Sequence, residues 1–154
     1  MNKILEGKVL VNGTDIWKEY GVFLTEEKPG GRDNQTALMT PAKAKSHVGV
    51  NIREENGVKY SDRLTVSNEE REITLHFALF AKSRREWLSQ YRRFIAFVKH
   101  GDGGWLDMEF PDLDLKIRAY YMESTNFKPL TYLSEEGVQA SRFKVKFKEP
   151  EPAL

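Results

Sequence analysis

The residues best suited to chemistry are five acids gathered in one stretch: Asp102, Asp107, Glu109, Asp112 and Asp114. Paired carboxylates can serve general acid–base catalysis or hold a hard cation. However, Asp107 and Glu109 alternate with apolar residues and fall on the polar face of a predicted strand. Asp112 and Asp114 flank a turn that follows Pro111. Acids in such positions are usually solvated, so we predict no catalytic residue and no metal site here.

Other residues with catalytic or ligand-binding chemistry lack the spacing that such chemistry requires. The three histidines, His47, His76 and His100, are not at metal-ligand spacing from one another. The absence of cysteine excludes disulfides and thiolate metal sites. The glycine-rich stretch 101–104 lacks the flanking strand, helix and lysine of a phosphate-binding loop. No serine lies in a nucleophile-elbow pattern. We predict a protein that is not an enzyme, with no cofactor and no small-molecule substrate.

Four cations alternate along the last predicted strand: Arg142, Lys144, Lys146 and Lys148. Side chains on one face of a strand repeat every ~6.5 Å, a spacing that fits a phosphate backbone or an acidic neighbouring subunit. Lysines also protect a strand edge against unwanted pairing. The chain has 24 basic and 23 acidic residues and a formal net charge of +1, which argues against a protein built mainly to bind nucleic acid. We favour edge protection or contact with another subunit.

A strand, a helix and a second strand between residues 71 and 110 organise the predicted fold. Residues 71–80 alternate between apolar and polar side chains, which predicts a half-buried strand. Ser83 and Glu86 form a capping box that opens a helix, and Gly101 is suited to end it. Apolar residues follow at helical spacing: Trp87, Leu88, Tyr91, Phe94, Ile95 and Val98. Residues 105–110 alternate again.

Shorter signals complete the predicted architecture. A helical turn is expected at residues 14–21, and further extended segments are expected at residues 8–11, 22–24, 47–52, 58–60, 113–122 and 138–148. We therefore predict a mainly β (β+α) fold: an antiparallel β-sandwich or barrel of about seven strands with one amphipathic helix packed on it.

Residues 25–46 differ in composition from the rest of the chain. This segment shows no periodicity and carries four cations, Lys28, Arg32, Lys43 and Lys45. Long loops inside compact domains tend to be functional or mobile, so both a surface excursion and a partner-binding arm remain open. We take these four cations, with Arg142, Lys144 and Lys146, as predicted subunit-interface residues. The 154 residues are predicted to form a single domain, 1–154.

No signal peptide or membrane span is predicted. No apolar run follows Met1, and the longest apolar stretches are shorter than the ~20 residues that a membrane helix needs. We expect a soluble intracellular product that does not bind a membrane.

Several motifs, taken in order, match one family. Residues 11–24 (VNGTDIWKEYGVFL) read as a strand, a turn, a Tyr-Gly pair and a second strand, and residues 41–50 (PAKAKSHVGV) as a basic arm leading into a strand. Residues 60–63 (YSDR) precede the long strand, and residues 103–105 (GGW) follow the helix. In this pattern the chain resembles the siphophage-type distal tail proteins, which form the ring-shaped hub at the tip of a non-contractile phage tail and share their fold with tail-tube proteins.

The resemblance implies a structural role. It suggests a homo-hexameric hub that joins the tail tube to the tail tip, with residues 25–46 crossing to the adjacent subunit. The expected partners are copies of itself and other phage or prophage tail proteins, with DNA only as cargo passing through the lumen. The expected location is the virion tail, after assembly in the cytoplasm of the bacterial host.

Three alternatives stay open at this point. A tail-tube, tail-terminator or baseplate subunit would have the same sequence features. A nucleic-acid-binding β-barrel would use the cations of the last strand, and its binding would depend steeply on salt. An enzyme would use Asp107, Glu109 and Asp112.

Overall fold

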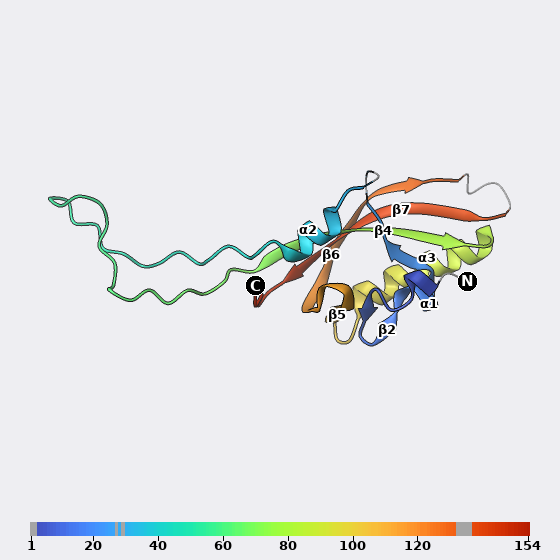
Figure 1. The fold of residues 1–154 in the computed structure, drawn as a ribbon, viewed down its shortest axis with the longest axis horizontal. Coiled ribbons are helices and arrows are strands. Elements are labelled where there is room, and N and C mark those ends of the chain that lie inside the picture. The colour runs from blue at the N-terminus through green and yellow to red at the C-terminus, as the bar shows by residue number, and fades with distance from the viewer. Residues whose placement is uncertain (1–2, 27, 29, 132–136) are drawn as a thin grey trace.

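In the described part of the chain, seven strands form one antiparallel sheet that curls into a half-barrel, in the order β2-β1-β5-β6-β7-β4-β3 (Figure 1). The structure is a computed structural model and describes residues 3–26, 28, 30–131 and 137–154. A long helix lies against one face of the sheet (Figure 1). The predicted class, mainly antiparallel β with a packed amphipathic helix, is therefore confirmed.

The longest ladder of the sheet joins β4 (Arg71–Ala81) to β7 (Gln139–Glu149). Its register is continuous from the pair Arg71 and Glu149 to the pair Ala81 and Gln139. Because side chains alternate along a strand, one face of this ladder is apolar. The side chains buried on that face are Ile73, Leu75, Phe77, Leu79, Phe143, Val145 and Phe147. The opposite face carries the cations of β7, as the alternation predicts.

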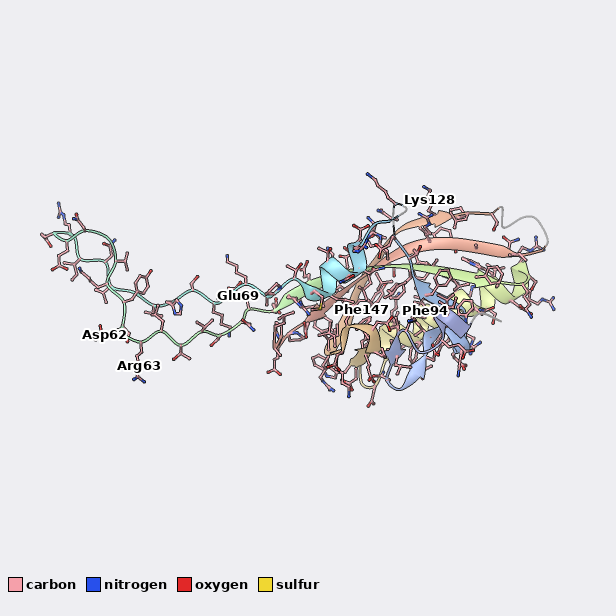
Figure 2. All side chains as sticks on the ribbon, viewed as in Figure 1. Asp62, Arg63, Glu69, Phe94, Lys128 and Phe147 are labelled. Carbon is pink, nitrogen blue, oxygen red and sulfur yellow. The ribbon has the colours of Figure 1, made fainter. Side chains whose placement is uncertain are left out.

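Helix α3 (Arg84–His100) covers the apolar face of the sheet. The Ser83 hydroxyl accepts a hydrogen bond from the Glu86 amide at 3.2 Å, which confirms the predicted cap. Inside the core, the ring of Phe94 lies 5.6 Å from that of Phe77 and 6.0 Å from that of Phe143. Aromatic pairs at such distances stabilise a core beyond the area they bury. Phe94 and Phe147 mark this core in Figure 2.

The N-terminal segment supplies both edges of the sheet, with β1 (Leu10–Val11) and β2 (Thr14–Asp15) at one edge and β3 (Val22–Leu24) at the other. It also contains the 3₁₀ helix η1 (Lys3–Leu5) and the short helix α1 (Ile16–Tyr20). Asp15 caps α1 by accepting from the amide of Trp17 at 3.1 Å. Gly21 ends the helix with a φ of 68°, and a Cβ there would lie 2.5 Å from the Phe80 carbonyl oxygen. Only glycine fits both constraints. The helical turn expected at residues 14–21 is confirmed.

The middle strands differ from expectation at two points. Leu113, expected to begin a strand, lies instead in the 3₁₀ helix η2 (Pro111–Leu113) between β5 (Leu106–Phe110) and β6 (Leu115–Pro129). β6 also continues to Pro129, beyond the predicted end at residue 122. Its distal half pairs with β7 but has no β5 residue opposite, so it buries little. The sequence of this distal half of β6 accordingly lacks the alternation of apolar and polar residues.

The segment predicted as an arm, residues 25–46, contains helix α2 (Asp33–Met39). Leu38 is 1% exposed and Asn34 4% exposed, so α2 packs on the body. The segment that leaves the body is residues 41–70, here called the arm (Figure 1). The strands expected at residues 47–52 and 58–60 lie within it, and their pairing is a single bridge between Val50 and Lys59. Glu27 and Pro29 of the predicted arm lie outside the described residues.

Candidate assembly surface

The arm is a two-limbed extension held together at its base and near its tip. At the base, the Glu69 amide donates to the Lys43 carbonyl at 2.7 Å and the Lys45 amide to the Ser67 carbonyl at 2.8 Å. Near the tip, Val50 and Lys59 exchange two backbone hydrogen bonds of 2.8 Å. The two limbs therefore run side by side, well away from the body (Figures 1 and 2).

A close approach of the two limbs explains one glycine in the arm. A Cβ at Gly49 would lie 2.5 Å from Cγ1 of Val58 and 2.8 Å from Cε1 of Tyr60. The rings of His47 and Tyr60 meet edge to face nearby, with centroids 6.5 Å apart. The limbs are thus packed against each other, although they touch nothing on the body at this level.

The arm exposes apolar side chains that the body does not cover. The most exposed is Val48, at 94% of its surface. The others with large exposed fractions are Val50, Ile52, Val58, Tyr60, Leu64 and Val66. Single exposed apolar residues are common on proteins, but a continuous group of them marks an interaction surface.

A buried ion pair fastens the base of the arm to the sheet. Arg71 Nε lies 2.7 Å from Glu149 Oε1, and both side chains are 7% exposed. The Arg71 guanidinium also donates through Nη1 to the carbonyls of Leu38, at 3.1 Å, and Thr40, at 2.6 Å. One side chain therefore connects the start of β4, the end of β7 and the end of α2. The root of the arm is fixed even though its tip is exposed.

The edge of β4 beyond β3 is covered by a side chain of α2. Asn34 Oδ1 accepts from the His76 amide at 2.7 Å, and its Nδ2 donates to the carbonyls of Thr25, at 2.7 Å, and His76, at 3.2 Å. The distal half of β6 has no β5 partner, but register shifts interrupt it and it ends at Pro129. Bulges and proline both oppose strand addition. These two stretches of edge are therefore poorly suited to the addition of a strand.

The outward cations of β7 have unequal environments. Lys148 Nζ donates a hydrogen bond to Glu70 Oε1 at 3.1 Å, and this bond raises the pKa of Lys148. Lys146 lies 3.4 Å from Glu123 and 3.8 Å from Glu72. Lys144 has no ion pair with any residue that the structure describes. The acids neutralise one end of the row and leave Lys144 unmatched.

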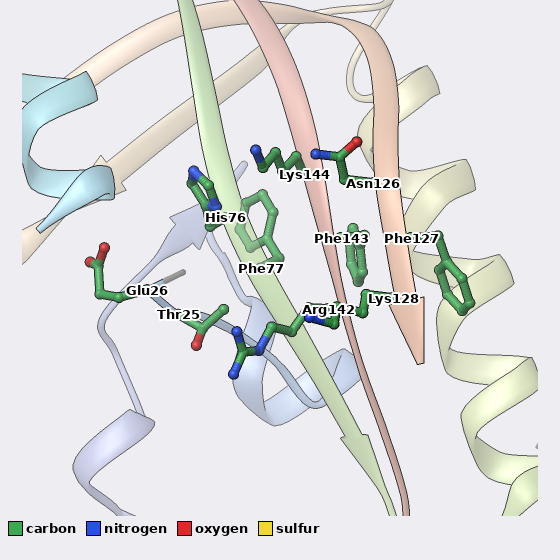
Figure 3. A pocket seen from close by; sticks show the side chains of 10 residues that line it. All are labelled: Thr25, Glu26, His76, Phe77, Asn126, Phe127, Lys128, Arg142, Phe143 and Lys144. Carbon is green, nitrogen blue, oxygen red and sulfur yellow. The ribbon is translucent and has the colours of Figure 1, made fainter. Parts of the chain in front are cut away.

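A hollow of about 360 Å³ surrounds this unmatched part of the row, on the sheet face opposite α3 (Figure 3). We call it the basic hollow. Its lining comes from the end of β3 and from β4, β6 and β7: Thr25, Glu26, His76, Phe77, Asn126, Phe127, Lys128, Arg142, Phe143 and Lys144. The backbone of Asn126 has a φ of 52°, at the register shift that leads β6 to Lys128.

The seven predicted interface cations do not form one site. Lys28 and Arg32 lie exposed before and at the start of α2, and Lys43 and Lys45 lie at the base of the arm. Arg142, Lys144 and Lys146 lie on the outward face of β7. Their role at an interface stays a prediction.

Two groups of residues at this surface were not predicted. Lys128 joins the basic hollow only through the irregular register of β6, which no sequence period reveals. Among the exposed apolar residues of the arm, those at 47–52 and 58–60 fall in segments that the sequence predicts as ordinary strands, whereas Leu64 and Val66 fall in no predicted element. The charged turn at residues 53–57 and the charges of Asp62 and Arg63 interrupt the apolar alternation, and this interruption was the available signal that these residues lie outside the core.

Two of the acidic residues considered for catalysis form exposed ion pairs. Asp107 lies 3.2 Å from Arg118, and Asp112 lies 2.7 Å from Lys8, with all four side chains exposed. Among the described residues, no group of three or more histidines or acids could hold a metal ion. None of the helices in the described part of the chain is long and apolar enough to span a membrane.

Comparison with known proteins identifies a structural relative only. No protein-family model and no curated protein matches the chain. Its fold is similar to that of the Dit (gp 19.1) protein of phage SPP1, described as a paradigm of the hub adsorption apparatus in phages that infect Gram-positive bacteria. The TM-score is 0.57 at 12% sequence identity, over 92% of this chain and 49% of the Dit chain. The chain thus spans about half the length of that protein, and the likeness is one of fold.

Proposed function

We propose that this chain is a structural subunit of a phage or prophage tail: a hub protein that assembles into a ring and joins the tail tube to the tail tip. The single observation that carries the proposal is the arm, a rooted extension whose apolar side chains have no cover on their own body. The fold shared with the Dit protein supports the same role.

The arm favours association between copies of the chain over a monomeric state. Its root lies at the start of β4 and the end of β7, and the arm extends from there away from the sheet (Figure 1). A contact between two different surfaces is heterologous, and its repetition gives a ring when the rotation closes. The proposed partners are therefore sister copies in the ring and other tail proteins above and below it. DNA would pass through the lumen only as cargo.

The proposed location follows from this role: the virion tail, after assembly in the host cytoplasm. The nearest alternative is a tail-tube, tail-terminator or baseplate subunit. Negative-stain microscopy separates them, because a tube subunit stacks into long cylinders and a hub forms single rings.

Light scattering of the full chain tests the proposal. The wild-type chain is expected as an oligomer, and the double variant Val48→Ser with Val66→Ser is expected as a monomer with unchanged unfolding, since both side chains are exposed. The matched control carries Val138→Ser, an exposed valine outside the arm, and should still assemble. A monomeric wild type at high concentration, or a double variant that assembles normally, would contradict the proposal.

A further inference from the structure

The basic hollow has an unbalanced charge. Two cations that line it, Lys128 and Lys144, have no ion pair with any residue in the described part of the chain. One acid lines it, Glu26, and its Oε2 already accepts from the amide of Asp33 at 2.6 Å. Lys146, the next outward residue on β7, is matched by two acids. Ammonium groups in this arrangement are suited to carboxylates supplied from outside.

The tip of the arm carries two adjacent carboxylates, which lie between Arg53 and Lys59 in the sequence. Glu54 and Glu55 are adjacent and exposed in a turn where the Glu55 amide donates to the Ile52 carbonyl at 3.1 Å. Glu55 lies 3.8 Å from Lys59, an exposed pair that contributes little to stability. Glu54 has no ion pair with a described residue. The tip therefore presents two carboxylates at the farthest point that the chain reaches.

The length of the arm allows this tip to reach across a neighbour. About ten extended residues separate the base from the tip, which at ~3.3 Å each spans roughly 30 Å. A body of this size has a radius of gyration of roughly 14 Å, so the arm is about as long as one body is wide. A tip that leaves one copy can thus lie on the sheet face of the next.

We propose that the arm tip of one copy docks in the basic hollow of a second copy, where Glu54 and Glu55 pair with Lys128 and Lys144. This inference rests on the proposed self-assembly and assigns the place of contact. The apolar limbs of the arm supply area, and the charged tip fixes the register. Charge pairs at the rim of an interface set specificity more than affinity. The same hollow could attract phosphate, so nucleic acid is the competing occupant and an outcome of the test.

Cysteine cross-linking tests the contact directly, since the chain has no cysteine of its own. The test variant carries Asn56→Cys, at the arm tip, with Thr125→Cys, which lies opposite Lys144 in the β6–β7 register. A short bis-maleimide is used because it tolerates a wider range of geometries than a disulfide does. The control carries Asn56→Cys with Ser89→Cys, an exposed residue of α3 on the other face of the sheet. We expect covalent species larger than a dimer from the test variant and only background from the control.

Charge reversal adds a second readout. Lys144→Glu should reduce cross-linking roughly tenfold, and adding Glu54→Lys with Glu55→Lys should restore it, because a single like-charge contact costs more than about 1.4 kcal/mol. Lys146→Glu, on the same strand, should have little effect. The docking would be overturned if the test variant cross-linked no more than the control, or if the reversed glutamates did not restore the cross-linking lost in Lys144→Glu. It would also be overturned if Lys144→Glu lost binding to an oligonucleotide but kept its cross-linking. Light scattering on the same samples reports assembly separately. Ring-sized oligomers without tip-to-hollow cross-links would overturn this contact alone. Cross-links without ring-sized oligomers would support this contact and contradict the closed ring.

Discussion

Asn34 bonds the main chain of His76 in both directions: its Oδ1 accepts from the His76 amide at 2.7 Å, and its Nδ2 donates to the His76 carbonyl at 3.2 Å. The Thr25 amide, directly after β3, still donates to the His76 carbonyl at 2.9 Å, while the Asn34 side chain takes the place of the Thr25 carbonyl as the acceptor of the His76 amide. The helix that carries it, α2, thereby completes the sheet where the strand ends. Asn34 is 4% exposed, so these bonds are shielded from water.

The first prediction concerns the hydrogen bonds between the Asn34 side chain and the main chain of His76. Asn34→Ala leaves the His76 amide buried without a partner, so the free energy of unfolding should fall by about 2 kcal/mol. Gln35→Ala, at the adjacent exposed position of α2, should change it by less than about 0.5 kcal/mol. Urea unfolding followed by circular dichroism measures both. Equal effects of the two variants would show that Asn34 does not close the edge.

The second prediction concerns the ion pair of Arg71 and Glu149. Arg71→Ala leaves the Glu149 carboxylate buried without its cation and should lower the free energy of unfolding by about 3–5 kcal/mol. Arg71→Met combined with Glu149→Leu removes both charges and should cost less than the single variant. Chemical denaturation compares the two. A double variant no more stable than Arg71→Ala would contradict the view that the unpaired buried carboxylate of Glu149 causes the loss.

The third prediction concerns the packing of the two limbs. In Gly49→Val the new side chain meets Val58 and Tyr60, so the limbs should separate near the tip. Limited trypsin digestion should then cut faster after Arg53, Lys59 and Arg63, while thermal unfolding of the body stays the same. Gly57→Val serves as a partial control, because a Cβ at that position would meet nothing within 4 Å, although its φ of 70° adds strain. Unchanged digestion in Gly49→Val would mean that the limbs do not depend on this contact.

The fourth prediction concerns alkaline pH. Burial raises the pKa of Tyr91 above its usual value of 10.0, and a coulombic contribution from Tyr121 acts in the same direction. The unfolded chain therefore releases the Tyr91 proton first as pH rises, and stability falls through and above pH 10. Tyr91→Phe should lose less stability between pH 9 and pH 11 than the wild type, by urea unfolding at both values.

Two other groups change stability in the same pH range. Burial also raises the pKa of Tyr20, and Glu70 raises that of Lys148, so the wild-type loss has several contributors with the same sign. The comparison of Tyr91→Phe with Tyr60→Phe, an exposed tyrosine of the arm, isolates the buried ring. An identical pH dependence in both variants would contradict the assignment to Tyr91.

The parts of the fold that the sequence predicted are those with a regular period and a buried face. Alternation in β4 and β7 identified the side chains on each face, and the spacing from Trp87 to Val98 identified α3. Turn chemistry was equally informative, since Asp15 and Gly21 delimit α1 within the helical turn expected at residues 14–21. In each case the local pattern and the tertiary contact require the same residue types.

The parts that were not predicted depend on contacts between distant segments. Helix α2 spans two turns and buries Asn34 and Leu38, too few residues for a period to appear. The boundaries of the arm are set by Arg71 and by bonds from Ala42 and Asn68 to the last residues of the chain, which lie far away in sequence. The basic hollow depends on a register shift in β6. A one-residue change of register cannot be inferred from composition.

The direct passage of the arm into β4 has a mechanical consequence. A load on the arm would enter the body at Arg71 along the axis of β4. Antiparallel hydrogen bonds lie perpendicular to the strands, so tension of this direction would shear the β4–β7 ladder as a whole instead of opening it bond by bond. A particle held together by such arms would transmit pulling forces through its most extensively paired strands.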